Sequence, residues 1–367
     1  MITGGGTGGH IFPMRALADA LVARGVSESE LRFVGSRRGK ESELLGGSAV
    51  SLTRLPGRGL QRSWRPGAVV ANCGAVGGLL VATVGAVILL RRWRATAVVS
   101  VGGYASAAAT LAALWWRVPL IVVEFDAAPG VVSRFAARHA RWRCCAFPTS
   151  GDNVLVTGAP VRSEVESVDR SPPARARTSA HMTPPLDPDR TVVVVMTGSL
   201  GSARVNGAVT ELAETWRLRT DVALIHVTGR RDFEVVRDRA PKTCGLDYRV
   251  VPFADMTLMW TVCDVAICRA GAITVAELTT LAIPSVLVPL PGAPDDHQMK
   301  NALTVEGVGG AVVIRDDLCT GEALERVLES ITSPTVLSAM AEGARSLGRR
   351  GAALRIADVT ISARVVP

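Results

Sequence analysis

The sequence predicts an α/β protein made of two doubly wound domains, each a parallel sheet with helices on both faces. A chain of 367 residues is longer than one ordinary domain. Short β-branched runs alternate with segments of helical periodicity, a pattern typical of parallel sheets. The alternation stops at residues 163–190, which are rich in Pro, Ser, Arg and Asp and have no apolar period. We therefore expect an amino domain (1–162), a linker (163–190), a carboxyl domain (191–344) and a last helix (345–367) that returns to the amino domain.

The individual strands follow from the β-branched runs. In chain order they are residues 31–35, 97–101, 119–123 and 154–156 in the amino domain, and 192–196, 223–227, 248–251, 265–267 and 285–288 in the carboxyl domain. Helical periodicity is plainest over residues 14–24 and 105–116. Only Met1, Ile2 and Thr3 precede the first glycines. We favour an upstream translation start over a stub strand, because so short a central strand would leave the sheet poorly paired.

Composition excludes a disordered or fibrous chain, since 48% of the residues are hydrophobic and only 20% are charged. The formal net charge of +8 suits anionic partners. We do not expect nucleic acid among them, because the basic residues are not interleaved with stacking aromatics. Seven scattered cysteines without a C-x-x-C pair predict a reducing, cytoplasmic environment, and the first ten residues lack the pattern of a signal peptide.

Residues 68–90 are nearly uninterrupted apolar sequence and are followed by Arg91, Arg92, Trp93 and Arg94. The run is long enough to span a bilayer. We favour a helix that lies on the inner leaflet with its basic cluster on lipid phosphates, and a buried core helix is the other alternative. Trp93 and the pair at 115–116 fit interfacial anchors or ordinary core packing equally well.

Three loops have the composition of phosphate-binding turns. Residues 4–10 satisfy G-x-G-x-x-G before a helix, where glycines permit close backbone approach and free N–H groups attract an anion. His10 in this loop can hydrogen-bond an oxygen or relay a proton. The second expected strand ends in Gly35-Ser36-Arg37-Arg38 rather than in an acid, which argues against an NAD site and leaves an NADP-dependent oxidoreductase as a distant alternative.

The other two loops lie in the carboxyl domain, at residues 197–204 and 269–277. We expect a helix that starts near Gly271 to aim its amides and Thr274 at a phosphate, with Glu277, one turn further in, placed to bind a ribose diol. A polar loop at residues 290–298 ends the next strand, where ligands of open α/β sheets bind. Asp187-Pro188-Asp189 has the spacing of a metal-binding D-x-D motif, but its place in a Pro-rich segment favours solvated surface.

Seven motifs occur in order between Gly4 and about Val313. They are GGGTGGH (4–10), VGGYAS (101–106), E-x-x-A-x-P-G (124–130), TGAPVR (157–162), GSLGSAR (198–204), RAGAITVAE (269–277) and PLPGAPDDHQMKNA (289–302). The series resembles the MurG family of peptidoglycan N-acetylglucosaminyltransferases, within glycosyltransferase family 28, which convert lipid I to lipid II. The resemblance implies a GT-B fold, with two Rossmann-like domains facing across a cleft. It also implies an inverting transferase on the cytoplasmic face of the plasma membrane, peripherally bound, with no obligatory metal or other cofactor.

The resemblance assigns roles to individual residues. The donor-binding residues are Thr7, Gly8, Gly9, Arg162, Ser199, Ala254, Ile273, Thr274, Glu277, Gln298 and Asn301. Among them the backbone of Ala254 meets uracil, Ile273 and Thr274 line the nucleotide site, and Glu277 binds the ribose. Ser199 and Arg162 meet the diphosphate, and Gln298 and Asn301 meet the sugar. His10, with Thr7 and Gly9, faces the reacting centre from the amino domain.

The chemistry also needs a general base for the acceptor hydroxyl, for which His10 is the first candidate, with Glu124 and Asp126 as alternatives. The family usually has His-Glu-Gln-Asn where this chain has Val-Glu-Phe-Asp at 123–126. This departure falls on the acceptor side, whereas the nucleotide loops depart less. It leaves open a MurG-like UDP-sugar transferase that acts on a phosphoglycolipid or lipopeptide intermediate in antibiotic biosynthesis.

Overall fold

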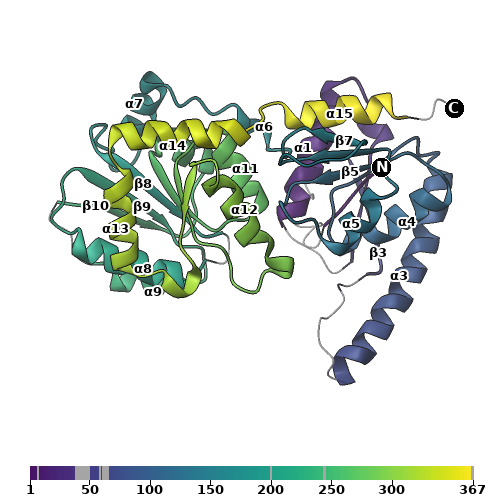
Figure 1. The fold of residues 1–367 in the computed structure, drawn as a ribbon, viewed down its shortest axis with the longest axis horizontal. Helices are drawn as coiled ribbons and strands as arrows, with labels where there is room; N and C mark the ends of the chain where they lie inside the picture. Colours follow the sequence, from purple (N-terminus) through teal and green to yellow (C-terminus); the bar gives the residue numbers. More distant parts are fainter. Residues whose placement is uncertain are drawn as a thin grey trace. The chain divides into compact units, whose positions relative to one another are not determined.

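The computed structural model describes residues 1–5, 8–37, 50–57, 59, 66–198, 201–242 and 245–364, without the side chains of residues 66–71. The chain forms two compact units (Figure 1). The amino unit contains Met1–Arg162 together with Gly351–Pro367, and the carboxyl unit contains Ser163–Arg350. Each unit is an α/β layer structure around one parallel sheet, as the strand and helix alternation predicts.

The amino unit has a seven-stranded sheet in the order β3-β2-β1-β4-β5-β6-β7, and every described pairing in it is parallel. Its strands are β1 (Ile2–Thr3), β2 (Arg32–Ser36), β3 (Ser51–Leu55), β4 (Val98–Ser100), β5 (Leu120–Glu124), β6 (Trp142–Cys145) and β7 (Val154–Val156). Its helices are α1 (Gly8–Ala23), α3 (Pro66–Arg92), α4 (Ala107–Trp115), α5 (Val131–Ala137) and α15 (Ala352–Ser362). The order reverses between β1 and β4, so the carboxyl ends of these strands form the switch point where ligands of such sheets bind.

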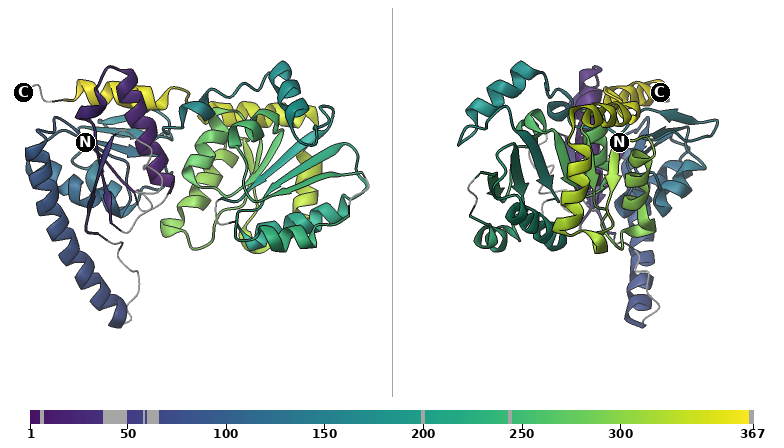
Figure 2. Two further views of the ribbon diagram at one scale, coloured as in Figure 1. Left: turned by 180° about the vertical axis from the view of Figure 1, so that it is seen from behind. Right: turned by 60° about the vertical axis from the view of Figure 1, so that its left-hand side comes forward.

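The helices of the amino unit cover both faces of its sheet (Figure 2). Helix α15 packs along α1, and buried side chains of α3, α4 and α5 share one core with β2, β4 and β5. Helix α1 begins at Gly8, six residues before the predicted start, so that His10 lies in its first turn. Strand β1 has only two residues, and the upstream start stays a prediction.

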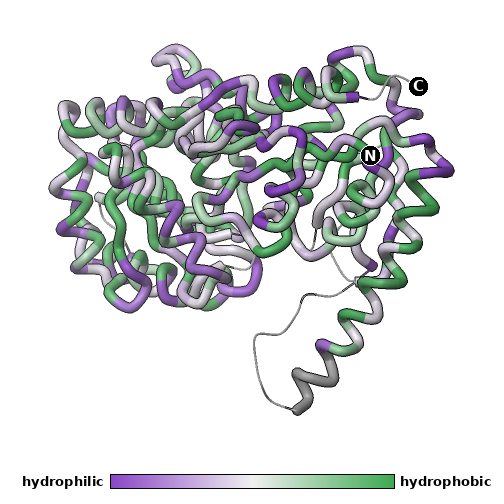
Figure 3. The backbone as a smooth tube through the Cα atoms, turned by 45° about the vertical axis from the view of Figure 1, so that its right-hand side comes forward, coloured by the Kyte–Doolittle hydropathy of each residue, from purple (hydrophilic) through white to green (hydrophobic). Residues whose placement is uncertain are grey.

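Helix α3 is not the fully buried core helix that was the alternative to a helix on the inner leaflet. It projects beyond the sheet of its own unit, and its tube is mostly hydrophobic (Figures 1 and 3). Its apolar stretch within Asn72–Arg92 has a mean hydropathy of 2.3, yet only 22% of that stretch is buried. Small residues, among them Ala82 and Ala86, let one side pack against the alanines of α4. In the described part of the chain it is the one helix long and apolar enough to cross a membrane.

The carboxyl unit has a six-stranded parallel sheet in the order β10-β9-β8-β11-β12-β13. The strands are β8 (Thr191–Met196), β9 (Val222–Val227), β10 (Asp247–Val251), β11 (Val265–Cys268), β12 (Ser285–Leu287) and β13 (Ala311–Val313). The helices are α8 (Ala203–Thr215), α9 (Phe233–Arg239), α10 (Met256–Val262), α11 (Ala272–Thr280), α12 (His297–Glu306), α13 (Gly321–Ile331) and α14 (Pro334–Leu347). Its core joins β8, β9, β11 and β12 to α8 and α13.

The segment expected to be a linker without regular structure is instead part of the carboxyl unit. It holds two helices, α6 (Ser163–Glu166) and α7 (Pro172–His181). Ser171 caps α7 by accepting a hydrogen bond from the Ala174 amide, and proline occupies the first helical position. Helix α6 packs against α10 and α11, and α7 packs against α10. An apolar period does not reveal these helices, because the segment buries only scattered apolar side chains, among them Val165 and Leu186, beside polar contacts of Arg170 and Arg175.

Candidate active site

The carboxyl edge of the amino-unit sheet is formed by glycine backbone. A Cβ atom on Gly4, after β1, would lie 2.2 Å from Val101 Cγ2, and one on Gly103 would lie 2.5 Å from the Gly5 carbonyl oxygen. Gly102 and Gly103, after β4, have positive φ angles of 86° and 77°. The loops after β1 and β4 therefore approach each other at a distance that only glycine permits.

His10 lies at this edge and is half-buried. Its ring contacts that of Phe125 at the end of β5, with the centroids 5.4 Å apart and the planes tilted by 59°. Added Cβ atoms on Gly102 and Gly103 would come within 3.6 and 3.5 Å of the imidazole. The structure thus brings the first candidate base to the point where the loops after β1, β4 and β5 converge.

The two candidate carboxylates differ in their surroundings. Glu124 is buried, and its Oε2 accepts a hydrogen bond from Arg143 at 3.0 Å and one from the Cys145 thiol at 3.4 Å. Burial, with the nearby Glu124, raises the pKa of Cys145 to about 12, so this thiol stays protonated and donates. Asp126 is only half-buried. Glu124 therefore joins β5 to β6 through one carboxylate oxygen and stays a predicted alternative base, and Asp126 is the more accessible carboxylate.

The expected diphosphate ligand Arg162 ends the amino unit. Its guanidinium carbon lies 5.3 Å from the centroid of the Phe12 ring on α1, two residues from His10. Gly8 and Gly9 begin the same helix. Ser199, the other expected diphosphate ligand, and Thr7, expected beside His10 at the reacting centre, lie outside the described residues.

Arg269 joins the three loops that follow β8, β11 and β12 in the carboxyl unit. Its guanidinium donates to the carbonyl oxygens of Val288 and Pro289, at 3.0 and 3.2 Å, and to Ser202 Oγ at 2.6 Å. It also forms an ion pair with Asp316 at 2.7 Å. Sequence reasoning did not assign Arg269 a role, because its partners are far apart along the chain.

A buried network supports the loop after β8. Gly201 has a φ of 77°, and a Cβ atom there would lie 2.2 Å from the Thr228 carbonyl oxygen. The Asn206 amide donates to the same carbonyl at 3.0 Å, and its Oδ1 lies 3.0 Å from Nε2 of the wholly buried His226. His226 Nδ1 lies 2.9 Å from the Tyr248 hydroxyl. Burial lowers the pKa of His226 to about 3, so the imidazole is neutral, donates through Nε2 and accepts from Tyr248.

The expected nucleoside ligands lie on α10 and α11. Ile273 and Thr274 are half-exposed in the first turn of α11, and Ala254 is half-exposed just before α10. Glu277, one turn further along α11, is 6% exposed. The indole Nε1 of Trp260, a wholly buried residue of α10, donates to Glu277 Oε2 at 3.1 Å. The structure therefore links the two helices through a residue that the sequence analysis missed.

The two expected sugar ligands on α12 have different environments. Gln298 is half-exposed, and its Oε1 accepts a hydrogen bond from the Leu290 amide at 3.0 Å. Asn301 is wholly buried and donates to the Ala270 carbonyl oxygen at 3.2 Å. Gln298 lies at the carboxyl edge of the sheet, whereas Asn301 supports the loop after β11, and both stay predicted sugar ligands.

Within the described ranges no group of three or more His, Cys, Asp or Glu side chains has the arrangement of a metal site. Asp187 of the D-x-D sequence accepts a hydrogen bond from the Asp189 amide at 3.0 Å and so closes its own turn.

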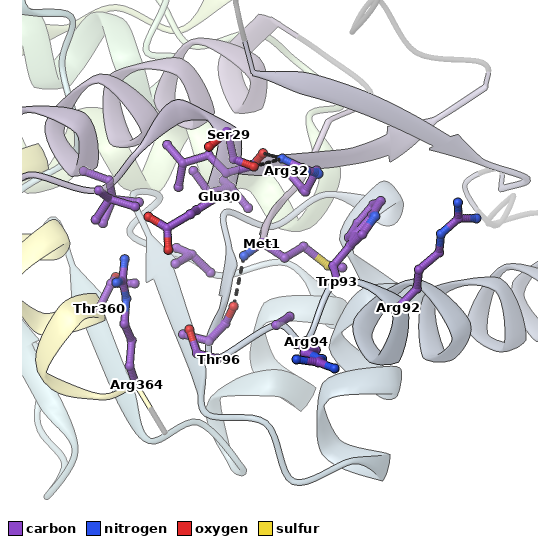
Figure 4. A pocket seen from close by; sticks show the side chains of 17 residues that line it. Met1, Ser29, Glu30, Arg32, Arg92, Trp93, Arg94, Thr96, Thr360 and Arg364 are labelled. Atoms are coloured by element: carbon purple, nitrogen blue, oxygen red, sulfur yellow. Dashed lines mark hydrogen bonds between the residues drawn. The ribbon is translucent and has the colours of Figure 1, made fainter. Parts of the chain in front are cut away.

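A cavity of about 390 Å³ lies at the opposite edge of the amino-unit sheet, beside the amino ends of β1, β2 and β4 (Figure 4). Four arginines line it, Arg32, Arg92, Arg94 and Arg364. The Met1 amino group donates to the Ala97 carbonyl oxygen at 3.0 Å, and burial, with Arg364 and Arg32 nearby, lowers its pKa to about 5. The cavity is remote from the glycine loops of the amino unit and does not belong to the candidate site at the carboxyl edge of either sheet.

Two doubly wound units, each with glycine loops at the carboxyl edge of its sheet, are the architecture of the GT-B fold. The N-terminal domain model of glycosyltransferase family 28 matches residues 1–142, and the C-terminal domain model matches residues 192–356. The chain therefore belongs to glycosyltransferase family 28. This membership replaces the alternative of an NADP-dependent oxidoreductase.

Curated relatives extend the likeness over the whole chain. The UDP-N-acetylglucosamine–N-acetylmuramyl-(pentapeptide) pyrophosphoryl-undecaprenol N-acetylglucosamine transferase of Anaeromyxobacter dehalogenans (strain 2CP-1) is 37% identical over 370 residues, covering 98% of this chain and 91% of the relative. The enzyme of the same name from Moorella thermoacetica is 35% identical over 381 residues, covering 98% of both chains.

Solved structures give the same fold. MurG of Acinetobacter baumannii superposes with a TM-score of 0.79 at 25% identity, covering 99% of this chain and 98% of that one. The glycosyltransferase of kitacinnamycin gives a TM-score of 0.67 at 16% identity, covering 99% of both chains, a likeness of fold alone.

Proposed function

We propose that the protein transfers N-acetylglucosamine from UDP-GlcNAc to a polyprenyl-pyrophosphate-linked muramyl-peptide acceptor, the conversion of lipid I to lipid II. The observation that carries the proposal is the 35–37% identity over 98% of the chain to transferases of that name. The carboxyl edges of the two sheets support it, since the edge in the amino unit offers His10 and the edge in the carboxyl unit offers the expected nucleoside ligands.

The reaction inverts the sugar configuration in one displacement. The acceptor hydroxyl oxygen bonds to the anomeric carbon as the bond to the UDP β-phosphate oxygen breaks, and the electron pair leaves with UDP. His10, at the convergence of the amino-unit loops, takes the hydroxyl proton. Arg162 and the helix start after β8 stabilise the charge that builds on the leaving diphosphate. Asp126 is the alternative base.

The donor nucleoside binds the carboxyl unit. In this proposal Glu277 receives the ribose hydroxyls, Ala254 meets uracil through its backbone, and Gln298 meets the sugar. The half-buried Arg269 contacts and the buried Asn206 network fix the loops that, in this proposal, surround the diphosphate. Preorganised loops of this kind stabilise a transition state without reorganising during the reaction.

A second acceptor is favoured by one observation. Phe125 replaces the amide usual in the family, and its ring lies against His10 instead of offering a polar group to an acceptor. An enzyme of antibiotic biosynthesis that glycosylates a phosphoglycolipid or lipopeptide intermediate is therefore the alternative function.

We also propose that α3 attaches the protein peripherally to the cytoplasmic face of the plasma membrane. Val76, Leu80, Val84 and Ile88 recur at every fourth position, and all are half or more exposed. Trp115, at the end of α4, is 78% exposed. The basic residues at the end of α3 fit lipid phosphates beside this apolar surface.

The experiment is transfer of radiolabelled GlcNAc from UDP-GlcNAc to two acceptors, a short-chain lipid I analogue and a prenyl-phosphoglycerate glycoside. We expect labelled lipid II product. Label only on the second acceptor contradicts the cell-wall assignment and supports the antibiotic-pathway alternative. Binding of UDP with label on neither acceptor contradicts both assignments.

A further inference from the structure

The segment 163–190 has no part in the proposed reaction, yet it contacts the back of the nucleoside site. Arg170, between α6 and α7, donates to the carbonyl oxygens of Trp260 and, at 2.8 Å, of Cys263. These carbonyls belong to the carboxyl end of α10, where backbone acceptors lack partners within the helix and a cation is favourable. Arg175 forms an ion pair with Asp264, the next residue along, and donates to its Oδ2 at 2.8 Å. Two arginines of the segment therefore fix the end of α10.

Helix α10 contacts both residues that, in the proposed function, bind the nucleoside: Ala254 at the uracil and Glu277 at the ribose. Ala254, the expected uracil contact, directly precedes the helix, whose start is capped by Asp255 through the Thr257 amide. Trp260, in its last turn, donates from its indole to Glu277 at 3.1 Å. A shift of α10 would therefore move the uracil contact and the partner of the ribose carboxylate together.

The chemistry of the Trp260 contact suits a ligand-binding carboxylate. Glu124, the other buried glutamate at a candidate edge, is paired with a guanidinium that neutralises its charge. An indole N–H is a neutral donor, so it orients the Glu277 carboxylate while leaving its negative charge to accept hydrogen bonds from hydroxyls. A charged acceptor fixed in this way binds a vicinal diol more strongly than a carboxylate that is free to rotate.

We propose that Trp260 is a positioning residue for the ribose of the donor, and that Arg170 sets its place, so that the segment 163–190 tunes affinity for a uridine nucleotide. The inference rests on the proposed function, because it assumes that Glu277 binds the ribose diol.

The test is Trp260→Phe, which removes the indole N–H and retains an aromatic ring in the core. Binding of UDP and of 2′-deoxy-UDP is measured by calorimetry on the full chain. We expect Kd for UDP to rise about tenfold, roughly 1.4 kcal/mol, and Kd for 2′-deoxy-UDP to rise less than twofold. We expect kcat at saturating UDP-GlcNAc to stay within about twofold, because the reacting groups are unchanged.

Trp216→Phe is the matched control. Trp216 is also buried in the carboxyl unit, and its indole donates to the Glu325 carboxylate at 3.1 Å, away from α10 and α11. Its replacement removes the same kind of bond, and we expect it to leave both dissociation constants unchanged. If both variants weaken UDP and 2′-deoxy-UDP alike, the effect is one of general stability and the positioning role is wrong.

Two further variants separate the inference from its premise. Glu277→Ala should abolish the preference for UDP over 2′-deoxy-UDP. If it does and Trp260→Phe does not reduce that preference, the positioning inference fails alone. If Glu277→Ala leaves the preference intact, the ribose assignment fails and the inference with it. Arg170→Gln should raise Kd for UDP several-fold and reduce the preference for UDP over 2′-deoxy-UDP. Its effect on that preference should vanish in the Trp260→Phe background, whereas additive effects on the preference would contradict the link through Trp260.

Discussion

At the scale of single residues, His10 is the group on which turnover should depend most. It lies in the first turn of α1 against Phe125, where the loops of the amino-unit edge converge. We expect His10→Gln to lower kcat by about 10² to 10⁴, the usual contribution of a general base, with little change in UDP affinity. The measurements are steady-state kinetics and calorimetry, with His139→Gln, an exposed histidine of the same unit, as control. Normal turnover of the variant would remove His10 from the mechanism.

His226 should make the stability of the carboxyl unit depend on pH. Its pKa is about 3 in the folded protein against the ordinary 6.5, so between these values the unfolded chain binds a proton that the folded chain does not. The free energy of unfolding is therefore highest above pH 6.5 and decreases as the pH falls, by about 2 kcal/mol at pH 5. Urea titrations at several pH values should show this slope, and it should flatten in His226→Gln. An unchanged slope in that variant, or a flattened one in the exposed His181→Gln, would contradict this account.

The sequence identifies most residues at the candidate edges but few of their supports. The glycine loops, His10 and Glu277 follow patterns that are local in the chain, and local patterns can be recognised without a structure. Trp260, Asn206 and Arg269 act on partners between 17 and 67 positions away, which no periodicity or spacing reveals. Asn301 and Glu124 have suitable side chains, and only the structure shows that both are also buried and hydrogen-bonded to neighbouring loops or strands.

At the scale of elements, α3 should govern membrane binding. Replacing Arg91, Arg92 and Arg94 together by Gln should weaken binding to phosphatidylglycerol vesicles, by about 1 kcal/mol for each residue near the surface. Sedimentation with vesicles at two salt concentrations measures this loss, which should shrink at high salt. The triple Arg→Gln variant at 231, 237 and 326, exposed positions of the carboxyl unit, is the control. Equal partitioning of all three proteins would move the membrane contact away from the end of α3.

The apolar face of α3 should contribute separately from its charges. Leu80→Ser with Val84→Ser removes two exposed side chains of roughly 1.5–3 kcal/mol each on full burial, and we expect weaker vesicle binding that does not recover at low salt. Circular dichroism and thermal unfolding should change little, because neither residue belongs to the α3–α4 core. Retained binding would show that the stripe does not enter lipid.

The predicted strands largely match the observed ones. Strands β3 and β6 were missed because Arg54 and Arg143 interrupt their apolar runs, whereas β13 was missed although residues 311–314 are apolar. Helices α6 and α7 escaped notice because their buried apolar side chains, such as Val165, are too few and too scattered to give a period. Hydrophobic patterning finds the elements that bury a whole face and misses those that bury single side chains beside polar contacts.

At the scale of the whole molecule, UDP should protect mainly the carboxyl unit. A ligand at 100 times its Kd stabilises the unit that binds it by about 2.7 kcal/mol. Hydrogen exchange of the slowest amides of β8, β9 and β11 should therefore slow by about 100-fold, while amides of β2, β4 and β5 change little. Glu277→Ala should reduce this protection. Equal protection of both sheets would mean that UDP alone engages both units.

The amino unit is completed by residues from both ends of the chain. Helix α15 lies along α1, where Arg24 donates to the Asp358 carboxylate at 2.6 and 2.9 Å, and Arg355 donates to the Thr157 carbonyl oxygen at 2.7 Å. During synthesis the ribosome must make all of the carboxyl unit, for about ten seconds or more, before α15 emerges. The carboxyl unit can therefore fold while the amino unit, which contains His10, still lacks its last helix. Premature termination near the end of translation would then prevent completion of the amino unit, although most of it was synthesised first.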